Sequence, residues 1–336
     1  MPDFFRRPAL LVVAALAASL LALPAPSVAA TPTLTGWLGG GAKFPARTMV
    51  LSAPSGITVN VPHMYIWENG GPVDHLSVTP IASANAGDFG VELVIDESNS
   101  MAGAPLAQAL AAARALAAQR TGNQELGVIG FNSGATATLP LTDDASAIKG
   151  ALSITPETAS GTRIAPALAL ALSQLKVSNI ADGEVILLSD GGATGSTGPA
   201  AVRTVTAQAK RQHVPIITIG LRDQAFKPAL LREIANAAGG RYIAATGAQL
   251  PNLFASIGAS LTHNYLIRYD SIIKPGHRVA VRVRVDGVSA QLHLSYYAPA
   301  AAPAVPTTPP PAATPTPTAT TAPAPAHRLV PNIPEL

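Results

Sequence analysis

The middle of the chain alternates between short apolar runs and longer segments with a helical pattern. The apolar runs cover residues 91–95, 126–131, 185–188 and 216–219. Strands that are apolar throughout are typical of a parallel sheet covered on both faces. The helical segments cover residues 105–118, 145–152, 164–175, 198–210, 230–238 and 250–261. Alternation of this kind predicts an α/β fold with a doubly wound, mostly parallel sheet.

Two regions that flank this part carry a different pattern, with apolar stretches separated by proline and glycine turns. In residues 279–285, valines alternate with alanine and arginine, which gives a strand one apolar face. Further strands are predicted at residues 47–53, 57–61, 64–67, 73–78, 265–269 and 290–297. Each flank has too few strands for a core of its own. We therefore predict that the flanks pair into one small β-sandwich with the α/β domain inserted between them; two separate β extensions are the alternative.

The two ends of the chain differ in composition from the rest. Arg6 and Arg7 precede an apolar stretch at 9–23 and small residues at 27–30, the pattern of a signal peptide, with a retained anchor as the alternative. Residues 299–326 contain only Ala, Pro, Thr and Val305, which cannot form a packed core. The predicted parts are a signal peptide (1–30), an N-terminal β segment (31–85), the α/β domain (86–261), a C-terminal β segment (262–298) and a disordered tail (299–336).

Composition excludes several classes of function. The net charge is only +3, and the lysines and arginines are scattered, so nucleic acid is not an expected partner. Cysteine is absent, so an exported chain must rely on core packing, for which 48% apolar residues suffice. The seven histidines form no zinc-spaced pair, and Ser98 lacks the glycines of a nucleophile elbow.

Oxygen-bearing side chains follow two of the predicted strands. Asp96, Ser98 and Ser100 come directly after 91–95, Asp190 follows 185–188, and Thr162 precedes the helix at 164–175. Ligands of open α/β sheets bind at the carboxyl ends of the strands. Carboxylates and hydroxyls suit Mg²⁺, Mn²⁺ or Ca²⁺ rather than zinc, so these five residues are the predicted metal ligands. Two further acidic features are not predicted to be metal ligands. Glu97 is expected to face solvent, and the pair Asp143-Asp144 is expected to cap the helix that follows it.

The order and spacing of these motifs resemble the metal-ion-dependent adhesion site of von Willebrand factor A domains. The resemblance rests on Asp96-Glu97-Ser98-Asn99-Ser100, Gly161-Thr162 and Ser189-Asp190-Gly191, and it covers about residues 86–260. It implies that Ser98, Ser100 and Thr162 act through their hydroxyls and that Asp96 and Asp190 bind the ion directly or through water. One coordination position would stay open for a partner's Asp or Glu. Asn99 departs from the glycine that the family often has there, which affects the shape of the loop.

The flanks resemble the β segments that bracket such domains in exported actinobacterial proteins, as in residues 265–271. Together the resemblances imply a secreted or cell-surface protein-binding module of the adhesion type, with one divalent cation. Mg²⁺ is the first expectation, and Mn²⁺ or Ca²⁺ are alternatives. The expected partner is an unknown protein that presents Asp or Glu.

The alternative to a binding module is a structural or assembly component of a bacterial envelope or secretion apparatus. Enzymatic activity is not expected, because no spare general base accompanies the metal ligands. No stable membrane span is expected once the signal peptide is removed.

Overall fold

The computed structural model describes residues 33–40, 42–192, 198–222 and 226–299. The predicted signal peptide (1–30) and, apart from Pro299, the predicted tail (299–336) lie outside these residues. Within the described ranges, none of the helices combines the length and the apolar character that crossing a membrane requires.

A six-stranded sheet, here called the central sheet, has the strand order β11-β10-β9-β6-β7-β8. Only β7 and β8 are antiparallel, so the predicted mostly parallel sheet is confirmed. Strands β6, β9 and β10 are buried at every residue, which is why they are nearly unbroken apolar runs in the sequence. The strands are β6 (Phe89–Asp96), β7 (Glu125–Phe131), β8 (Ala135–Thr142), β9 (Asp182–Ser189), β10 (Ile216–Leu221) and β11 (Tyr242–Ala245).

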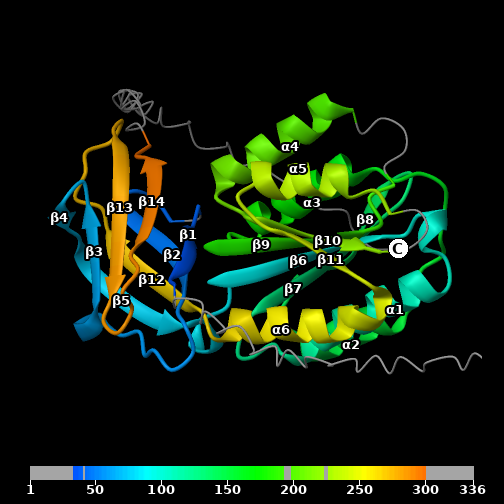
Figure 1. Ribbon diagram of the computed structural model, residues 1–336, viewed down its shortest axis with the longest axis horizontal. Helices are drawn as coiled ribbons and strands as arrows, with labels where there is room; N and C mark the ends of the chain where they lie inside the picture. The colour runs from blue at the N-terminus through cyan, green and yellow to red at the C-terminus, as the bar shows by residue number, and fades with distance from the viewer. Residues whose placement is uncertain (1–32, 41, 193–197, 223–225, 300–336) are drawn as a thin grey trace, which may run out of the picture. The chain divides into compact units, whose positions relative to one another are not determined.

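Helices cover both faces of the central sheet, as Figure 1 shows. One layer consists of α1 (Ala104–Ala118), α2 (Ala145–Ser153) and α6 (Leu250–Thr262), and the other of α3 (Ile164–Val177), α4 (Pro199–Gln212) and α5 (Pro228–Ala237). A proline in the first turn starts α1, α4, α5 and α6, where its missing N–H leaves no bond unmade. Each layer buries its own apolar core against the sheet, which confirms the doubly wound α/β architecture.

The two flanks fold together into a β-sandwich of two four-stranded sheets. Strand β2 of the first flank pairs with β12 of the second, and β3 pairs with β13, so the predicted joint sandwich is confirmed. The inner sheet contains β1 (Thr35–Leu38), β2 (Ala46–Ser52), β12 (Tyr265–Asp270) and β5 (Asp74–Pro80), and the outer sheet β14 (Leu292–Tyr297), β13 (Arg278–Val285), β3 (Met64–Glu68) and β4 (Gly71–Pro72).

The two middle strands of the inner sheet, β2 and β12, are buried on both faces. Met49 and Leu51 pack in the sandwich core, whereas Val50 between them packs in a core of the α/β domain. Leu266 of the neighbouring strand β12 packs in the same core of the α/β domain as Val50. The backbone N–H of Ile81 donates to the carbonyl of Asn264 over 2.9 Å where the chain enters and leaves the domain. The α/β domain therefore packs against the inner sheet of the sandwich.

One predicted strand of the first flank is wrong. Residues 57–60 have no regular structure, and Val61–His63 form a single 3-10 turn, η1. Pro62 occupies the start of that turn, and proline offers no N–H to a strand ladder. Val59 is nevertheless 4% exposed and packs in the sandwich core, which accounts for the apolar signal. Three further 3-10 turns are η2 (Ile81–Ser83), η3 (Asn99–Met101) and η4 (Gly247–Gln249).

Candidate metal site

Loops from four parts of the chain meet at the carboxyl ends of β6 and β9. Asp96 ends β6, and Ser98 leads into the η3 turn that contains Ser100. The N–H of Glu97 donates to Phe131 O over 2.7 Å, and the N–H of Ala159 donates to Glu97 O over 3.1 Å. These bonds place the loop after β7 and the loop before α3 on either side of the Asp96 loop.

The Asp96 carboxylate is held by two neighbours. Its Oδ1 accepts from the N–H of Ser98 over 2.9 Å, and its Oδ2 accepts from the hydroxyl of Ser189 over 2.5 Å. The hydroxyl oxygens of Ser98 and Ser100 lie 3.1 Å apart. Asp96 is fully buried, whereas Ser100 is exposed, so the group extends from the sheet edge to the surface.

Asp190 lies at the matching end of the adjacent strand. Its Oδ1 accepts from the N–H of Gly192 over 2.7 Å. Its Oδ2 is buried and has no hydrogen-bond partner among the residues that the structure describes. A buried carboxylate oxygen without a donor favours a cation as its missing partner.

Among the described residues, no basic side chain forms an ion pair with either of these two acids. Burial raises the pKa of Asp96 to about 6, and the negative charge of Asp190 adds to that rise. A divalent cation would stabilise both ionised carboxylates, since an opposite charge nearby favours the charged form.

Thr162 is carried by a tightly fitted loop. It is 2% exposed. Its neighbour Gly161 has φ +94°, and a Cβ at that position would lie 2.9 Å from the Cα of Ser133. The N–H of Arg163 donates to Asn132 O over 2.9 Å, and Ala159 forms a bridge with Ser98. Backbone bonds on both sides thus fix the segment that carries Thr162.

The structure therefore brings the loops of all five predicted ligands to one edge of the sheet. The five side chains offer only oxygen atoms as donors, and hard divalent cations prefer oxygen ligands. Among the described residues there is no group of three or more His, Cys, Asp and Glu side chains that could hold a metal. The predicted set contains only two carboxylates and would not form such a group, so the assignment of the ligands stays a prediction.

Two neighbouring residues differ from the prediction or were missed. Glu97 does not face solvent: it is half-buried beside Gly130, and burial together with Asp96 raises its pKa to about 7. Ser189 belongs to the motif Ser189-Asp190-Gly191 but was not given a role in the site, yet its hydroxyl donates to Asp96 and accepts from the N–H of Gly191 over 2.9 Å. The only signal for Ser189 in the sequence is its place directly before Asp190.

Comparison with known proteins agrees with the fold and with the motifs. Residues 91–193 match the family model of the von Willebrand factor type A domain. Over these residues the resemblance stated from the sequence is confirmed. The matched residues include the candidate ligands on β6, before α3 and after β9.

Solved structures also resemble the chain. A von Willebrand factor type A protein from Catenulispora acidiphila is 15% identical, with a TM-score of 0.50, and the match covers 81% of this chain and 75% of that one. The match extends well beyond residues 91–193, so the shared fold includes more than the family domain.

Two weaker matches are the von Willebrand factor domain of the type V pili tip protein Mfa5 from Porphyromonas gingivalis and proximal thread matrix protein 1 from the mussel byssus. The first is 17% identical, with a TM-score of 0.45, and covers 53% of this chain and 96% of that one. The second, described with a zinc-occupied metal-ion-dependent adhesion site motif, is 20% identical, with a TM-score of 0.46, and covers 57% and 49%. A search of curated proteins gave no match.

Proposed function

We propose that the chain is a metal-dependent protein-binding module that recognises an acidic residue of a partner at the edge of β6 and β9. The proposed ligands of the ion are Asp96, Ser98, Ser100, Thr162 and Asp190. When bound, the ion supplies a positively charged centre with an exchangeable coordination position. We further propose that the chain acts outside the cell or in the cell envelope, as the pattern of residues 1–30 indicates.

The observation that carries this proposal is the Oδ2 of Asp190, which is buried without a hydrogen-bond partner among the described residues. It lies at the sheet edge where the charge of Asp190 raises the pKa of Asp96. Ser100 is exposed at the same place, which gives a partner access to the site. The likeness to the family domain adds support through the matched residues.

The residues around Asp96 and Asp190 favour a binding role over catalysis. A hydrolase would need a general base within hydrogen-bond distance of the attacking water. The carboxylate of Glu97, which follows Asp96 in the sequence, packs against Gly130. We propose that the module makes and breaks no covalent bond.

Titration of the purified chain with Mg²⁺ and with Mn²⁺ by calorimetry tests the metal site. Asp190→Asn keeps the shape of the side chain and removes its charge, so Mg²⁺ affinity should fall by at least about tenfold. Asp143→Asn is the matched control, since Asp143 is exposed and lies outside the site. Equal Mg²⁺ affinity in Asp190→Asn and wild type would show that the ligands have been assigned wrongly.

The partner is tested with the same pair of proteins. An extract of the producing organism's envelope, or an extract of its host, is passed over immobilised wild type and over immobilised Asp190→Asn. Each column is run with Mg²⁺ and with chelator. The proposal expects one retained protein that chelator releases and that Asp190→Asn does not retain. A partner held equally well in excess chelator would move the binding surface away from these loops.

A further inference from the structure

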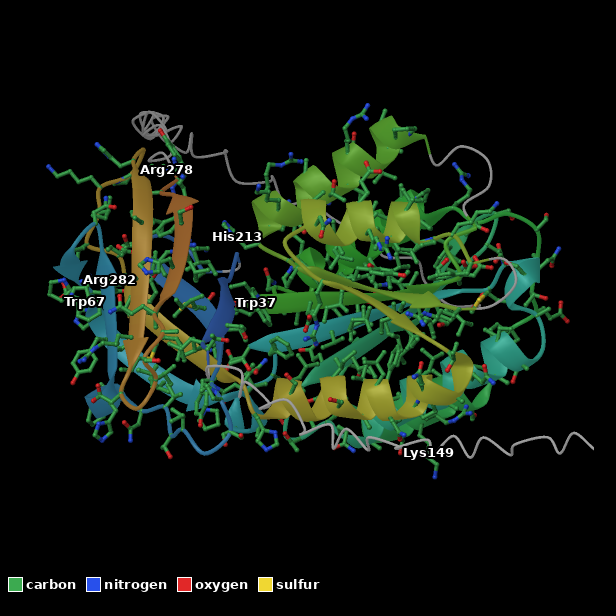
Figure 2. The ribbon with its side chains drawn as sticks, in the orientation of Figure 1. Trp37, Trp67, Lys149, His213, Arg278 and Arg282 are labelled. Carbon is green, nitrogen blue, oxygen red and sulfur yellow. The ribbon has the colours of Figure 1, made fainter. Side chains whose placement is uncertain are left out.

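One face of the outer sheet is exposed to solvent. In β13 every second residue is a valine that packs in the sandwich core, and the residues between the valines lie on the opposite face of the sheet. Strands β3 and β14 alternate in the same way. Figure 2 shows Trp67 and Arg282 on this face, at the side of the sandwich away from the α/β domain. The face is therefore separate from the candidate metal site.

Side chains of three neighbouring strands form a row on this face. Arg282 of β13 lies directly opposite Trp67 of β3 on one side and His293 of β14 on the other. In the next row, the small Ala280 stands beside Asn69, whose Oδ1 accepts from the N–H of Ala280 over 2.9 Å. These five residues help to line a hollow of about 350 Å³, here called the Ala280 hollow. Its volume lies in the range of about 300–1,000 Å³ for small-molecule sites.

Aromatic rings hold two arginines of this face in place. The Cζ of Arg282 lies 4.5 Å from the ring centroid of Trp67, and the Cζ of Arg284 lies 4.1 Å from that of Tyr65. The two rings stack on each other, with centroids 5.9 Å apart and planes at 14°. Attraction between a guanidinium and a ring restrains the arginine side chain. Arg282 therefore loses less conformational freedom when it binds an anion.

The positive charge of this face is not balanced by acids on the same strands. Glu68 is the only acidic residue of β3, β13 and β14, and it is buried. Arg284 lies 3.4 Å from Asp286, whereas Arg278 and Arg282 form no ion pair within the described part of the chain. The planar fork of an arginine matches the two oxygens of a carboxylate. The face is thus complementary to an anion that carries carboxylates.

We propose that the Ala280 hollow binds an acidic sugar unit, a uronic acid, of a polysaccharide. The sugar carboxylate accepts from the guanidinium of Arg282, the sugar ring fills the space above Ala280, and a sugar hydroxyl pairs with the exposed imidazole of His293. Arg278 lies four residues along β13, which is about 14 Å at the rise of a strand. It therefore meets a later carboxylate of the same polymer.

Other polyanions fit this face less well. The bases of a nucleic acid stack on free aromatic faces, whereas a guanidinium already covers one face of Trp67 and one face of Tyr65. An acidic peptide offers carboxylates on flexible side chains, which would leave the Ala280 hollow unfilled. A uronic acid combines a rigid ring, hydroxyls and a carboxylate in one unit.

The indole N–H of Trp67 reports on the hollow. The chain contains only two tryptophans, so its proton–nitrogen NMR spectrum has two indole signals, and the signal lost in Trp67→Phe belongs to Trp67. Titration of the full chain with trigalacturonate should shift this signal to saturation. The signal of Trp37, on β1 of the inner sheet, should stay in place. Chelator is present throughout, so that no ion at the candidate metal site can hold the carboxylates.

Two matched ligands separate the sugar ring from its charge. The methyl ester of trigalacturonate keeps the rings and lacks the charge. Tri-L-glutamate has the same net charge at neutral pH and lacks the rings. Each should bind at least about tenfold more weakly than trigalacturonate, because one loses the contact with Arg282 and the other leaves the hollow unfilled.

Three variants test the residues of the hollow. Arg282→Gln changes an exposed residue and should weaken trigalacturonate at least about tenfold. Arg203→Gln makes the same change at an exposed residue of α4 and should leave the affinity unaltered. Ala280→Leu fills the hollow from an exposed strand position, so it should keep the urea unfolding of wild type and lose the shift of the Trp67 signal.

Several results would overturn the proposal. One is the absence of any shift of the Trp67 signal at tens of millimolar trigalacturonate. Others are equal affinity for trigalacturonate and its methyl ester, or equal affinity for trigalacturonate and tri-L-glutamate. Wild-type affinity in Arg282→Gln, or in a folded Ala280→Leu, would show that the ligand binds elsewhere.

Discussion

Glu92 lies in β6, and neither of its carboxylate oxygens has a hydrogen-bond partner among the described residues. It fits only because position 127 of the adjacent strand is glycine: a Cβ there would lie 2.5 Å from Glu92 Oε2. Burial raises the pKa of Glu92 from an ordinary 4.5 to about 9. The folded chain therefore holds a proton at this residue over a pH range in which the unfolded chain has lost it.

The stability of the protein should fall as pH rises through this range. When the folded state binds more protons than the unfolded state, the free energy of unfolding decreases with pH, by up to about 1.4 kcal/mol per pH unit for one group. For Glu92 the range runs from 4.5 to about 9. Glu92→Gln should flatten this part of the profile in urea unfolding measured at pH 5, 7 and 9.

The exposed Asp143→Asn serves as the control for Glu92→Gln and should follow the wild-type profile. If wild type and Glu92→Gln lose stability in parallel between pH 5 and 9, the carboxyl of Glu92 is ionised in the folded protein. The pKa of Glu92 would then not be raised by burial.

Gly161 shapes the loop that carries Thr162. Its φ of +94° is a conformation that side chains with a Cβ rarely adopt, and Ser133 leaves no room for one. Gly161→Ala should therefore destabilise the protein by about 1–3 kcal/mol and weaken Mg²⁺ binding. Gly134→Ala is the control: it lies in a neighbouring loop, its Cβ would meet nothing within 4 Å, and it should change stability by less than about 0.5 kcal/mol. Unaltered unfolding of Gly161→Ala would mean that the loop relaxes freely.

Residue-level chemistry could be predicted where it is local in the sequence. Asp96, Ser98 and Ser100 stand within one short motif, so their common position follows from the end of one strand. The contact between Ser189 and Asp96 joins residues 93 positions apart, and no local pattern indicates it. The position of Glu97 depends on Gly130 in the adjacent strand, so its half-buried state is equally a result of tertiary packing.

At the level of elements, burial on both faces decided which strands could be predicted. Strands β6, β9 and β10 are buried throughout, and their sequences are nearly continuous apolar runs. Strand β8 is an edge strand in which only Leu139 is fully buried, and it contains Pro140, so it has no such run. Strands β1 and β11 were also missed, because each has four residues and lies at the edge of its sheet.

The β-sandwich depends on strands from both flanks. Strand β2 pairs with β12 over six residues, and β3 pairs with β13 over five, so residues 33–85 alone would leave both strands without their main partners. The fragment 33–85 should give a poorly dispersed NMR spectrum and no cooperative unfolding, since isolated strand pairs are marginally stable in water. The fragment 86–261 is the comparison and should unfold cooperatively. A folded 33–85 fragment would contradict the dependence of the two flanks on each other.

Across the whole molecule, β9 runs between two buried acidic residues. Asp190 of the candidate metal site follows its carboxyl end, and Glu184 lies near its amino end. The six residues from Glu184 to Asp190 span about 20 Å at the rise of a β-strand. Changes this far apart, with no shared partner, usually add without coupling. A change at Glu184 should therefore leave the affinity for the ion unaltered.

This independence gives a test that involves the stability of the entire chain. A ligand that binds only the native state stabilises it by about 2.7 kcal/mol when its concentration is a hundred times its dissociation constant. Mg²⁺ at that excess should raise the free energy of unfolding of wild type by this amount, and chelator should reverse the gain. Asp190→Asn should lose the gain, because its unpartnered carboxylate oxygen is replaced. Glu184→Gln should keep it in full. If both variants lose the response to Mg²⁺, the ion does not bind at the carboxyl end of β9 alone, and the two ends of the strand act as one coupled system.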